Sequence, residues 1–162
     1  MTLPVSERRY SAEARQALFW ALLVARCAGE EHVTSGRIAS AVLRSGSAAA
    51  YCEKAQFLPA RLVAAADEPG VMGSDECRGA VERAIAQAGF EIGSREHLAS
   101  VRPIPIEAVA QQVINALPSA AGAREITSLE LLLAMIRVDT SLRARLSSCG
   151  LSEEALRKEV EG

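Results

Sequence analysis

The chain has 162 residues, a length typical of one domain, and it can bury a hydrophobic core without disulfide or metal cross-links. Apolar residues make up 49% of it and exclude a disordered chain, while 18 basic against 20 acidic residues argue against a general binder of nucleic acid or anionic membranes. Aromatic residues are only 4% and alanine is abundant, which favours helices over strands. We therefore expect an all-α fold.

The first half of the chain carries four helix signals in succession. Ser11 is a favourable N-cap for a helix over 12–28 that ends at Gly29. Thr34 or Ser35 begins a shorter helix that reaches about residue 44, and Ser45–Ser47 reads as a turn. Further helices are expected over 48–56 and 60–66, before the Glu68-Pro69-Gly70 break that marks the best candidate boundary.

The second half begins with a predicted helix over 76–88, ended by Gly89. Two prolines forbid a continuous helix over 90–105, so the next helix is expected over 106–117, followed by a loop over 118–122. Thr127 and Glu130 form a capping box in front of an apolar helix, and short helices are expected over 142–148 and 152–160. No strand pattern is visible in the sequence.

The helix over 12–28 is apolar on every side. Its core face recurs at helical spacing, and a second apolar set covers the opposite side: Phe19, Trp20, Leu22, Leu23 and Val24. Large apolar patches seldom stay exposed. This second set is therefore the candidate protein-binding face, to be covered by a partner protein, by a second copy in a homodimer or by another part of the same chain.

Residues 33–43 and 126–136 resemble each other: each has an apolar residue, a Thr-Ser cap and an apolar helix that runs to Arg44 or Arg137. Each copy is followed by signals for two short helices. The chain thus reads as two tandem four-helix units.

These features resemble the double repeat of the Clp N-terminal domain, the helical module that receives substrates and adaptors on the Clp unfoldases ClpA and ClpC. The resemblance rests on the Tyr10-Ser11 opening, the two Thr-Ser caps and Leu131–Arg137, and it covers about residues 10–160. It implies one domain, with a first repeat over about 10–67, a connector over 68–73 and a second repeat over about 74–160. The second repeat fits imperfectly. Either 90–123 is an insertion, which we favour, or the helix over 106–117 has replaced its first helix.

The ATPase modules of Clp unfoldases are not expected here. A nucleotide-binding P-loop needs a lysine after glycine, but Glu53 and Arg157 precede the two lysines. In the ClpC branch, a glutamate after each cap threonine helps to bind phosphoarginine. The matching positions here are Gly36 and Leu129, so the resemblance does not carry that ligand over.

The sequence gives only weak indications of a catalytic, nucleic-acid-binding or metal-binding site. Glu30, Glu31 and His32 could serve acid–base catalysis, but they lie between two helices, where a solvated loop is the favoured explanation. Cys27 beside His32 could be a nucleophile, although a buried thiol is expected, and Arg137, Arg143 and Arg145 form at most a small basic patch. No CxxC pair or zinc spacing is present among the cysteines and histidines: Cys27, Cys52, Cys77, Cys149, His32 and His97. We expect free thiols, no cofactor, no metal and no enzymatic activity.

Residues 1–9 contain no apolar signal segment, and the longest apolar run, 17–25, is shorter than the roughly 20 residues of a membrane span. The sequence therefore predicts a soluble, cytoplasmic, bacterial-type module that binds protein, either a Clp ATPase or its clients. The alternatives are a self-associating structural domain and a decoy for small molecules or peptides that target Clp motors.

Overall fold

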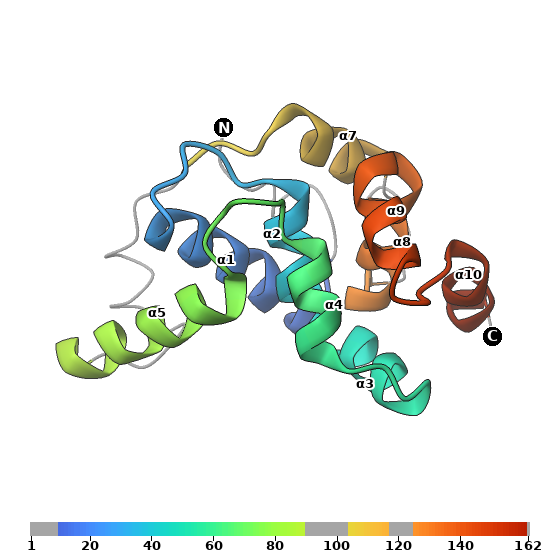
Figure 1. Ribbon diagram of the computed structural model, residues 1–162, viewed down its shortest axis with the longest axis horizontal. Helices are drawn as coiled ribbons and strands as arrows, with labels where there is room; N and C mark the ends of the chain where they lie inside the picture. Colours follow the sequence, from blue (N-terminus) through green and yellow to red (C-terminus); the bar gives the residue numbers. More distant parts are fainter. Residues whose placement is uncertain (1–9, 90–103, 117–124, 162) are drawn as a thin grey trace.

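The computed structural model describes residues 10–89, 104–116 and 125–161, and within these ranges the protein is all-α (Figure 1). The helices are α1 (Ala12–Cys27), α2 (Ser35–Leu43), α3 (Gly46–Lys54), α4 (Pro59–Ala66), α5 (Ser74–Ala88), α7 (Ala108–Ala116), α8 (Ser128–Val138), α9 (Thr140–Ser147) and α10 (Glu153–Glu161). None of these helices is both long enough and apolar enough to cross a bilayer. The predicted loop over 118–122 and most of the segment 90–123 lie outside the described residues.

The predicted helix starts are confirmed by the capping bonds. The side chains of Ser11, Thr34 and Thr127 accept hydrogen bonds from the backbone N–H three residues later, each at 3.2 Å. Four starts differ by two residues from the predicted ones, since α3 begins at Gly46, α5 at Ser74, α7 at Ala108 and α9 at Thr140. The Ser47 N–H donates to the carboxylate of Glu13 on α1 at 2.7 Å, which supports the first turn of α3 from outside.

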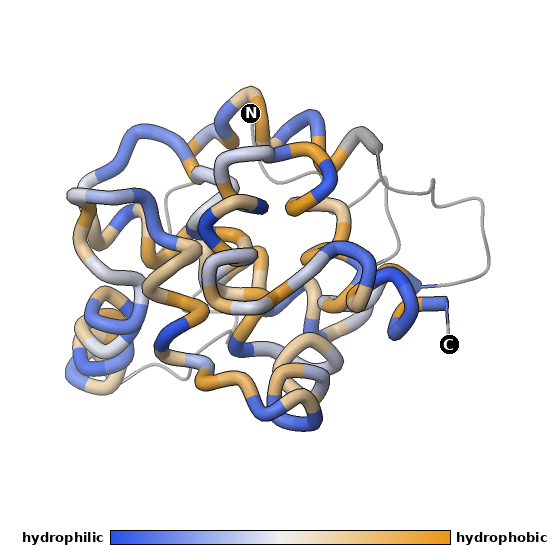
Figure 2. Tube along the Cα trace, turned by 45° about the vertical axis from the view of Figure 1, so that its right-hand side comes forward, coloured by the Kyte–Doolittle hydropathy of each residue, from blue (hydrophilic) through white to orange (hydrophobic). Residues whose placement is uncertain are grey.

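The hydrophobic core is centred on α2 and α8, which pack against each other. Around them, α2 contacts α1, α3 and α4, while α8 contacts α3, α7, α9 and α10. Ile38, Val42 and Leu43 on α2 are fully buried, as are Leu131 and Leu132 on α8. Hydrophobic and hydrophilic residues alternate at short intervals along the trace (Figure 2). This is the pattern of amphipathic helices around a shared core.

Two isolated bridges connect the segments that precede four helices. Tyr10, before α1, pairs with Ile126, before α8, and Val33, before α2, pairs with Ile106, before α7; both pairings are parallel. The Ser11 N–H donates to the Ile126 carbonyl oxygen at 2.9 Å. The two bridges thus connect the start of α1 to that of α8, and the start of α2 to that of α7.

Helix α5 lies at one edge of the molecule and α10 at the opposite edge (Figure 1). α5 packs against α1, α2 and α4 and buries few of its own side chains, chiefly Ser74, Cys77 and Ile85. It ends at Gly89 in the left-handed conformation, as predicted. Helix α5 therefore covers part of α1, the helix that carries the predicted binding face.

Candidate peptide-binding groove

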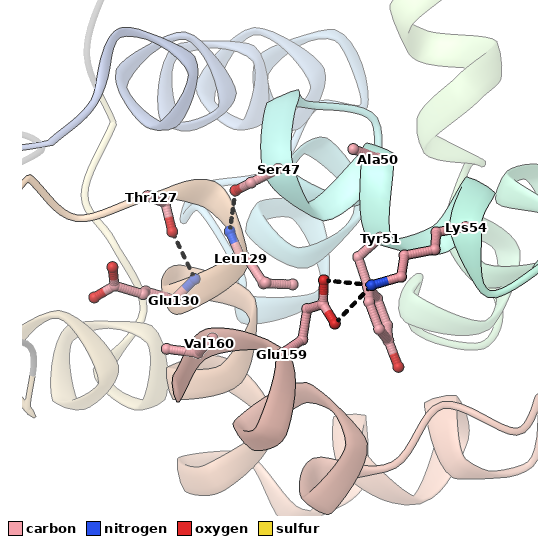
Figure 3. Close-up of a pocket in the computed structure, with 9 residues that line it drawn as sticks. All are labelled: Ser47, Ala50, Tyr51, Lys54, Thr127, Leu129, Glu130, Glu159 and Val160. Carbon is pink, nitrogen blue, oxygen red and sulfur yellow. Dashed lines mark hydrogen bonds and ion pairs between the residues drawn. The ribbon is translucent and has the colours of Figure 1, made fainter. Parts of the chain in front are cut away.

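An open groove of about 380 Å³ lies where α3 meets α8 and α10 (Figure 3). Three separate stretches of sequence line it: Ser47, Ala50, Tyr51 and Lys54 from α3; Thr127, Leu129 and Glu130 from the start of α8; Glu159 and Val160 from α10. The groove therefore brings α3 together with two helices that lie far along the chain from it. We call it the α3/α8/α10 groove.

The backbone N–H groups at the start of α8 are already hydrogen-bonded within the protein. The Leu129 N–H donates to Ser47 Oγ at 3.1 Å, and the Glu130 N–H donates to Thr127 Oγ1 at 3.2 Å (Figure 3). Ser128 Oγ donates to the Ser45 carbonyl oxygen at 2.9 Å and holds α3 against α8. Two of the N–H groups that usually make a helix start attractive to anions are thus satisfied here by hydroxyl groups.

An ion pair closes one end of the groove. Lys54 Nζ lies 3.2 and 3.3 Å from the two carboxylate oxygens of Glu159, and the two side chains are 72% and 35% exposed. Tyr51 stands beside this pair, and its pKa is raised by burial, with further contributions from Cys52 and Glu159. Glu130 lies at the other end (Figure 3). The lining residues together carry two carboxylates and one ammonium group.

The corresponding place in the first half is filled. Gly36 aligns with Leu129, and a methyl group at position 36 would lie 2.6 Å from the Ala66 carbonyl oxygen. Arg145 on α9 donates from Nε to the Ala65 carbonyl oxygen at 3.0 Å and from Nη2 to that of Ala66 at 3.1 Å. These bonds satisfy carbonyl groups at the end of α4. The close approach of α4 to α2 explains the glycine, and α4 occupies the space beside Gly36 that is open beside Leu129.

A second groove, of about 420 Å³, lies between the connector after α4 and helix α9. Its charged side chains include Asp67 and Arg145, both of which are already engaged in contacts within the protein. Among the described grooves, we favour the α3/α8/α10 groove as the binding site, because its charged end is exposed.

The predicted binding face of α1 is not exposed. Trp20, Leu22, Leu23 and Val24 are 3–7% exposed, and Phe19 is half-buried against the core. The sequence left open whether a partner protein, a second copy or the same chain covers this face, and in the structure the same chain covers it. Part of the same chain covers it: α5 packs on α1, and the guanidinium carbon of its Arg78 lies 4.3 Å from the centre of the Trp20 ring.

Buried Arg37 on α2 joins four segments into one polar network. Its Nε and Nη2 donate to the two carboxylate oxygens of Glu30 at 2.9 and 3.1 Å, and its Nη1 donates to Asp67 at 3.2 Å and to Ser74 Oγ at 2.9 Å. Burial lowers the pKa of Arg37, but its hydrogen bond to Glu30 and the attraction of Glu30 and Asp67 outweigh it and raise the pKa overall. Ser40 Oγ also donates to Asp67 at 3.1 Å. The network connects the loop after α1, helix α2, the end of α4 and the start of α5.

This network accounts for one of the predicted acid–base candidates, because Glu30 is the ion-pair partner of Arg37. Its neighbours Glu31 and His32 are exposed in the loop. The expectation that Cys27 is buried is wrong: its side chain is exposed at the end of α1.

The predicted arginine patch is divided among separate contacts. Arg137 forms an ion pair with Glu153 at 3.3 Å, and Arg145 binds the end of α4. Gly36 and Leu129, the positions at which the resemblance does not carry phosphoarginine binding over, each lie in the first turn of a helix, and Leu129 borders the α3/α8/α10 groove. Within the described ranges, no three His, Cys, Asp or Glu side chains are grouped as metal ligands.

Sequence reasoning missed the groove residues of α3 and α10. Tyr51, Lys54 and Glu159 stand in short helices that carry no motif, and Glu159 lies more than a hundred residues from the other two. The only available signal was the repeat itself, which placed Leu129 at a helix start that recurs in both halves.

No protein-family model and no curated protein matches the sequence. Among solved structures, the chain is similar to one from preliminary structural investigations of a malarial protein secretion system. The two share 16% sequence identity with a TM-score of 0.58, over 94% of this chain and 92% of that chain. At this identity the likeness shows a common all-α fold over nearly the whole length of both chains, and nothing about function.

Proposed function

We propose that this all-α domain is a non-enzymatic protein-binding module of the Clp N-terminal repeat type, adaptor-like or regulatory in Clp-dependent proteolysis. The reciprocal bridges support the repeat: Tyr10 with Ile126 and Val33 with Ile106 relate α1 and α2 to α7 and α8. In this scheme α1–α4 form the first repeat and α7–α10 the second. Of the two arrangements considered for the second repeat, the bridges favour the one in which the helix after Ile106 is its first helix. α5 is then an additional helix that covers α1.

The observation that carries the binding function is the α3/α8/α10 groove, because it is open and lies between the two repeats. Leu129 and Val160 provide apolar contacts, and the ion pair of Lys54 with Glu159 provides a polar end. An extended peptide from a client protein would lie in this groove without nucleotide or cofactor, its apolar side chains buried and its backbone partly solvated.

Phosphoarginine is not the ligand that we propose. Neither Gly36 nor Leu129 supplies the carboxylate that the resemblance would require, and Leu129 instead contributes an apolar surface. A phosphate group would also meet Glu159 in a groove whose nearby helix start has two of its N–H groups already hydrogen-bonded to hydroxyl oxygens.

Binding of a permanently unfolded protein, such as fluorescently labelled carboxymethylated lactalbumin, tests the proposal. Ala50 is exposed and lines the groove, so Ala50→Arg should fill it without disturbing the core. Ala84 is equally exposed, on α5 away from the groove, and Ala84→Arg is the matched control. We expect fluorescence anisotropy to show at least tenfold weaker binding for Ala50→Arg and no change for Ala84→Arg.

The same pair of variants tests the Clp connection. Purified Clp ATPase from the same source should bind wild-type protein or degrade its bound client, with the client step lost in Ala50→Arg. No binding of unfolded protein by the wild type, or equal binding by both variants, would contradict the groove as the binding site.

A further inference from the structure

Two of the four cysteines lie where α5 packs on α1. Cys27 is the last residue of α1 and its side chain is exposed, whereas Cys77 lies one turn into α5 and is fully buried. The two helices are in contact (Figure 1), and Arg78, the residue after Cys77, lies over the ring of Trp20. Because Cys27 follows Trp20 by seven residues, close to two helical turns, both lie on the side of α1 that faces α5.

The Arg37 network holds the chain beside both cysteines. Glu30 comes three residues after Cys27, and Ser74 comes three residues before Cys77. Arg37 Nε donates to the Glu30 carboxylate at 2.9 Å, and its Nη1 donates to Ser74 Oγ at 2.9 Å. One buried guanidinium group thus fixes the loop after α1 and the first turn of α5 to each other. The two segments are placed together by bonds that do not involve sulfur.

The two thiols also interact with each other. Burial is the largest cause of the raised pKa of Cys77, and Cys27 adds to it through its charge and through a hydrogen bond between the two side chains. A disulfide bond is about 2 Å long, so thiols within hydrogen-bonding range need only a small closing movement to form one. An oxidant dissolved in water reaches Cys27 first, because Cys77 is shielded from solvent.

We propose that Cys27 and Cys77 form a redox-responsive pair, which hydrogen peroxide converts into a disulfide bond that fixes α5 to α1. In the first step Cys27 Sγ, as the thiolate, attacks one peroxide oxygen. The O–O bond breaks, Cys27 becomes a sulfenic acid, and the departing hydroxide takes up the thiol proton to give water. In the second step Cys77 Sγ attacks Cys27 Sγ, the S–O bond breaks, and hydroxide leaves as water with the Cys77 proton. Two electrons pass from the two sulfurs to one peroxide, which is reduced to two waters.

The bond acts on the helix that covers α1. Helix α5 buries few of its own side chains, chiefly Ser74, Cys77 and Ile85, so Cys77 is one of its main attachments. The cross-link closes a loop of about fifty residues and removes freedom mainly from the unfolded chain. The oxidised protein therefore unfolds at a higher urea concentration than the reduced protein, with α5 fixed over Trp20. This device is independent of the α3/α8/α10 groove and of the proposed function.

Treatment of the purified protein with hydrogen peroxide tests the proposal. Titration with dithionitrobenzoate in denaturant should fall from four thiols per chain to two. Peptide mass spectrometry without reduction should find a peptide pair joined through Cys27 and Cys77. Urea denaturation should show a raised midpoint for the oxidised protein, and dithiothreitol should restore both the four thiols and the lower midpoint.

Two cysteine variants provide the comparison. Cys27→Ser removes the exposed partner without disturbing the core, so peroxide should leave Cys77 unmodified and the urea midpoint unchanged. Cys149→Ser, just after α9, is the matched control and should respond to peroxide as the wild type does. Oxidation of Cys27 without the cross-link, or a disulfide between two chains in its place, would overturn the proposal. A cross-linked protein whose urea midpoint is not raised would overturn it as well.

Discussion

Replacing Arg37 by methionine should destabilise the protein strongly although it keeps an unbranched side chain in place. Arg37 is 2% exposed and makes four hydrogen bonds to Glu30, Asp67 and Ser74. Removing one member of a buried ion pair usually costs about 3–5 kcal/mol, because the remaining charge loses its partner without gaining water. The structure decides where in that range the effect falls.

Two features favour the lower end. The Glu30 side chain is 19% exposed and can recover some hydration. Asp67 is only 8% exposed but keeps hydrogen bonds from Ser40 Oγ, at 3.1 Å, and from the Ser74 N–H, at 2.8 Å. We expect Arg37→Met to lower the free energy of unfolding by about 3 kcal/mol.

Urea denaturation followed by circular dichroism measures this loss, with the double variant Arg37→Met/Glu30→Gln as control. The double variant should recover about 1 kcal/mol of the lost free energy of unfolding, because it removes one of the two carboxylate charges that lose Arg37 as a partner. A loss below about 1 kcal/mol for Arg37→Met would refute the reasoning, and would mean that water replaces the arginine at both carboxylates.

Two further predictions follow from the packing of α2 and α5. Gly36→Ala should lower the free energy of unfolding by about 2 kcal/mol in the same urea assay, because the added methyl group would lie 2.6 Å from the backbone oxygen of Ala66. Gly79→Ala is the control and should be neutral or stabilising, because its methyl group meets only the end of a flexible arginine side chain at 3.4 Å. Equal effects of the two substitutions would contradict the close approach of α2 and α4. Burial and the neighbouring Cys27 raise the pKa of the Cys77 thiol from 9.0 to about 11, so its protonated form stabilises the fold below pH 9 and this contribution is lost as the pH rises towards 11. The free energy of unfolding of the wild type should therefore fall more steeply between pH 9 and 11 than that of Cys77→Ala. At pH 8, iodoacetamide should modify exposed Cys27 well before Cys77, which peptide mass spectrometry measures. Parallel pH curves or equal labelling rates would contradict the raised pKa of Cys77.

The helices were predictable because their signals are local. Caps at Ser11, Thr34 and Thr127 act within one turn, and each accepts the bond that its position implies. The start of α3 at Gly46 was predicted late, since it depends on a carboxylate from α1 that no local pattern reveals.

The candidate site was predictable only in part. The repeat placed Leu129 at a helix start, but Tyr51 and Glu159 joined it through the packing of α3 and α10. Periodicity also showed correctly that the outer side of α1 is apolar. It could not show that α5 covers Trp20, because the cover lies more than fifty residues along the chain.

By itself, the sequence determined an all-α fold, the starts and ends of most helices and the recurrence of one cap-and-helix pattern, because each depends on residues within a few turns of one another. Only the tertiary structure decided which apolar face stays covered, which of the two equivalent helix starts borders a groove and which charges meet there. Those outcomes depend on how closely distant helices approach, as at Gly36, where α4 fills the space that remains open beside Leu129.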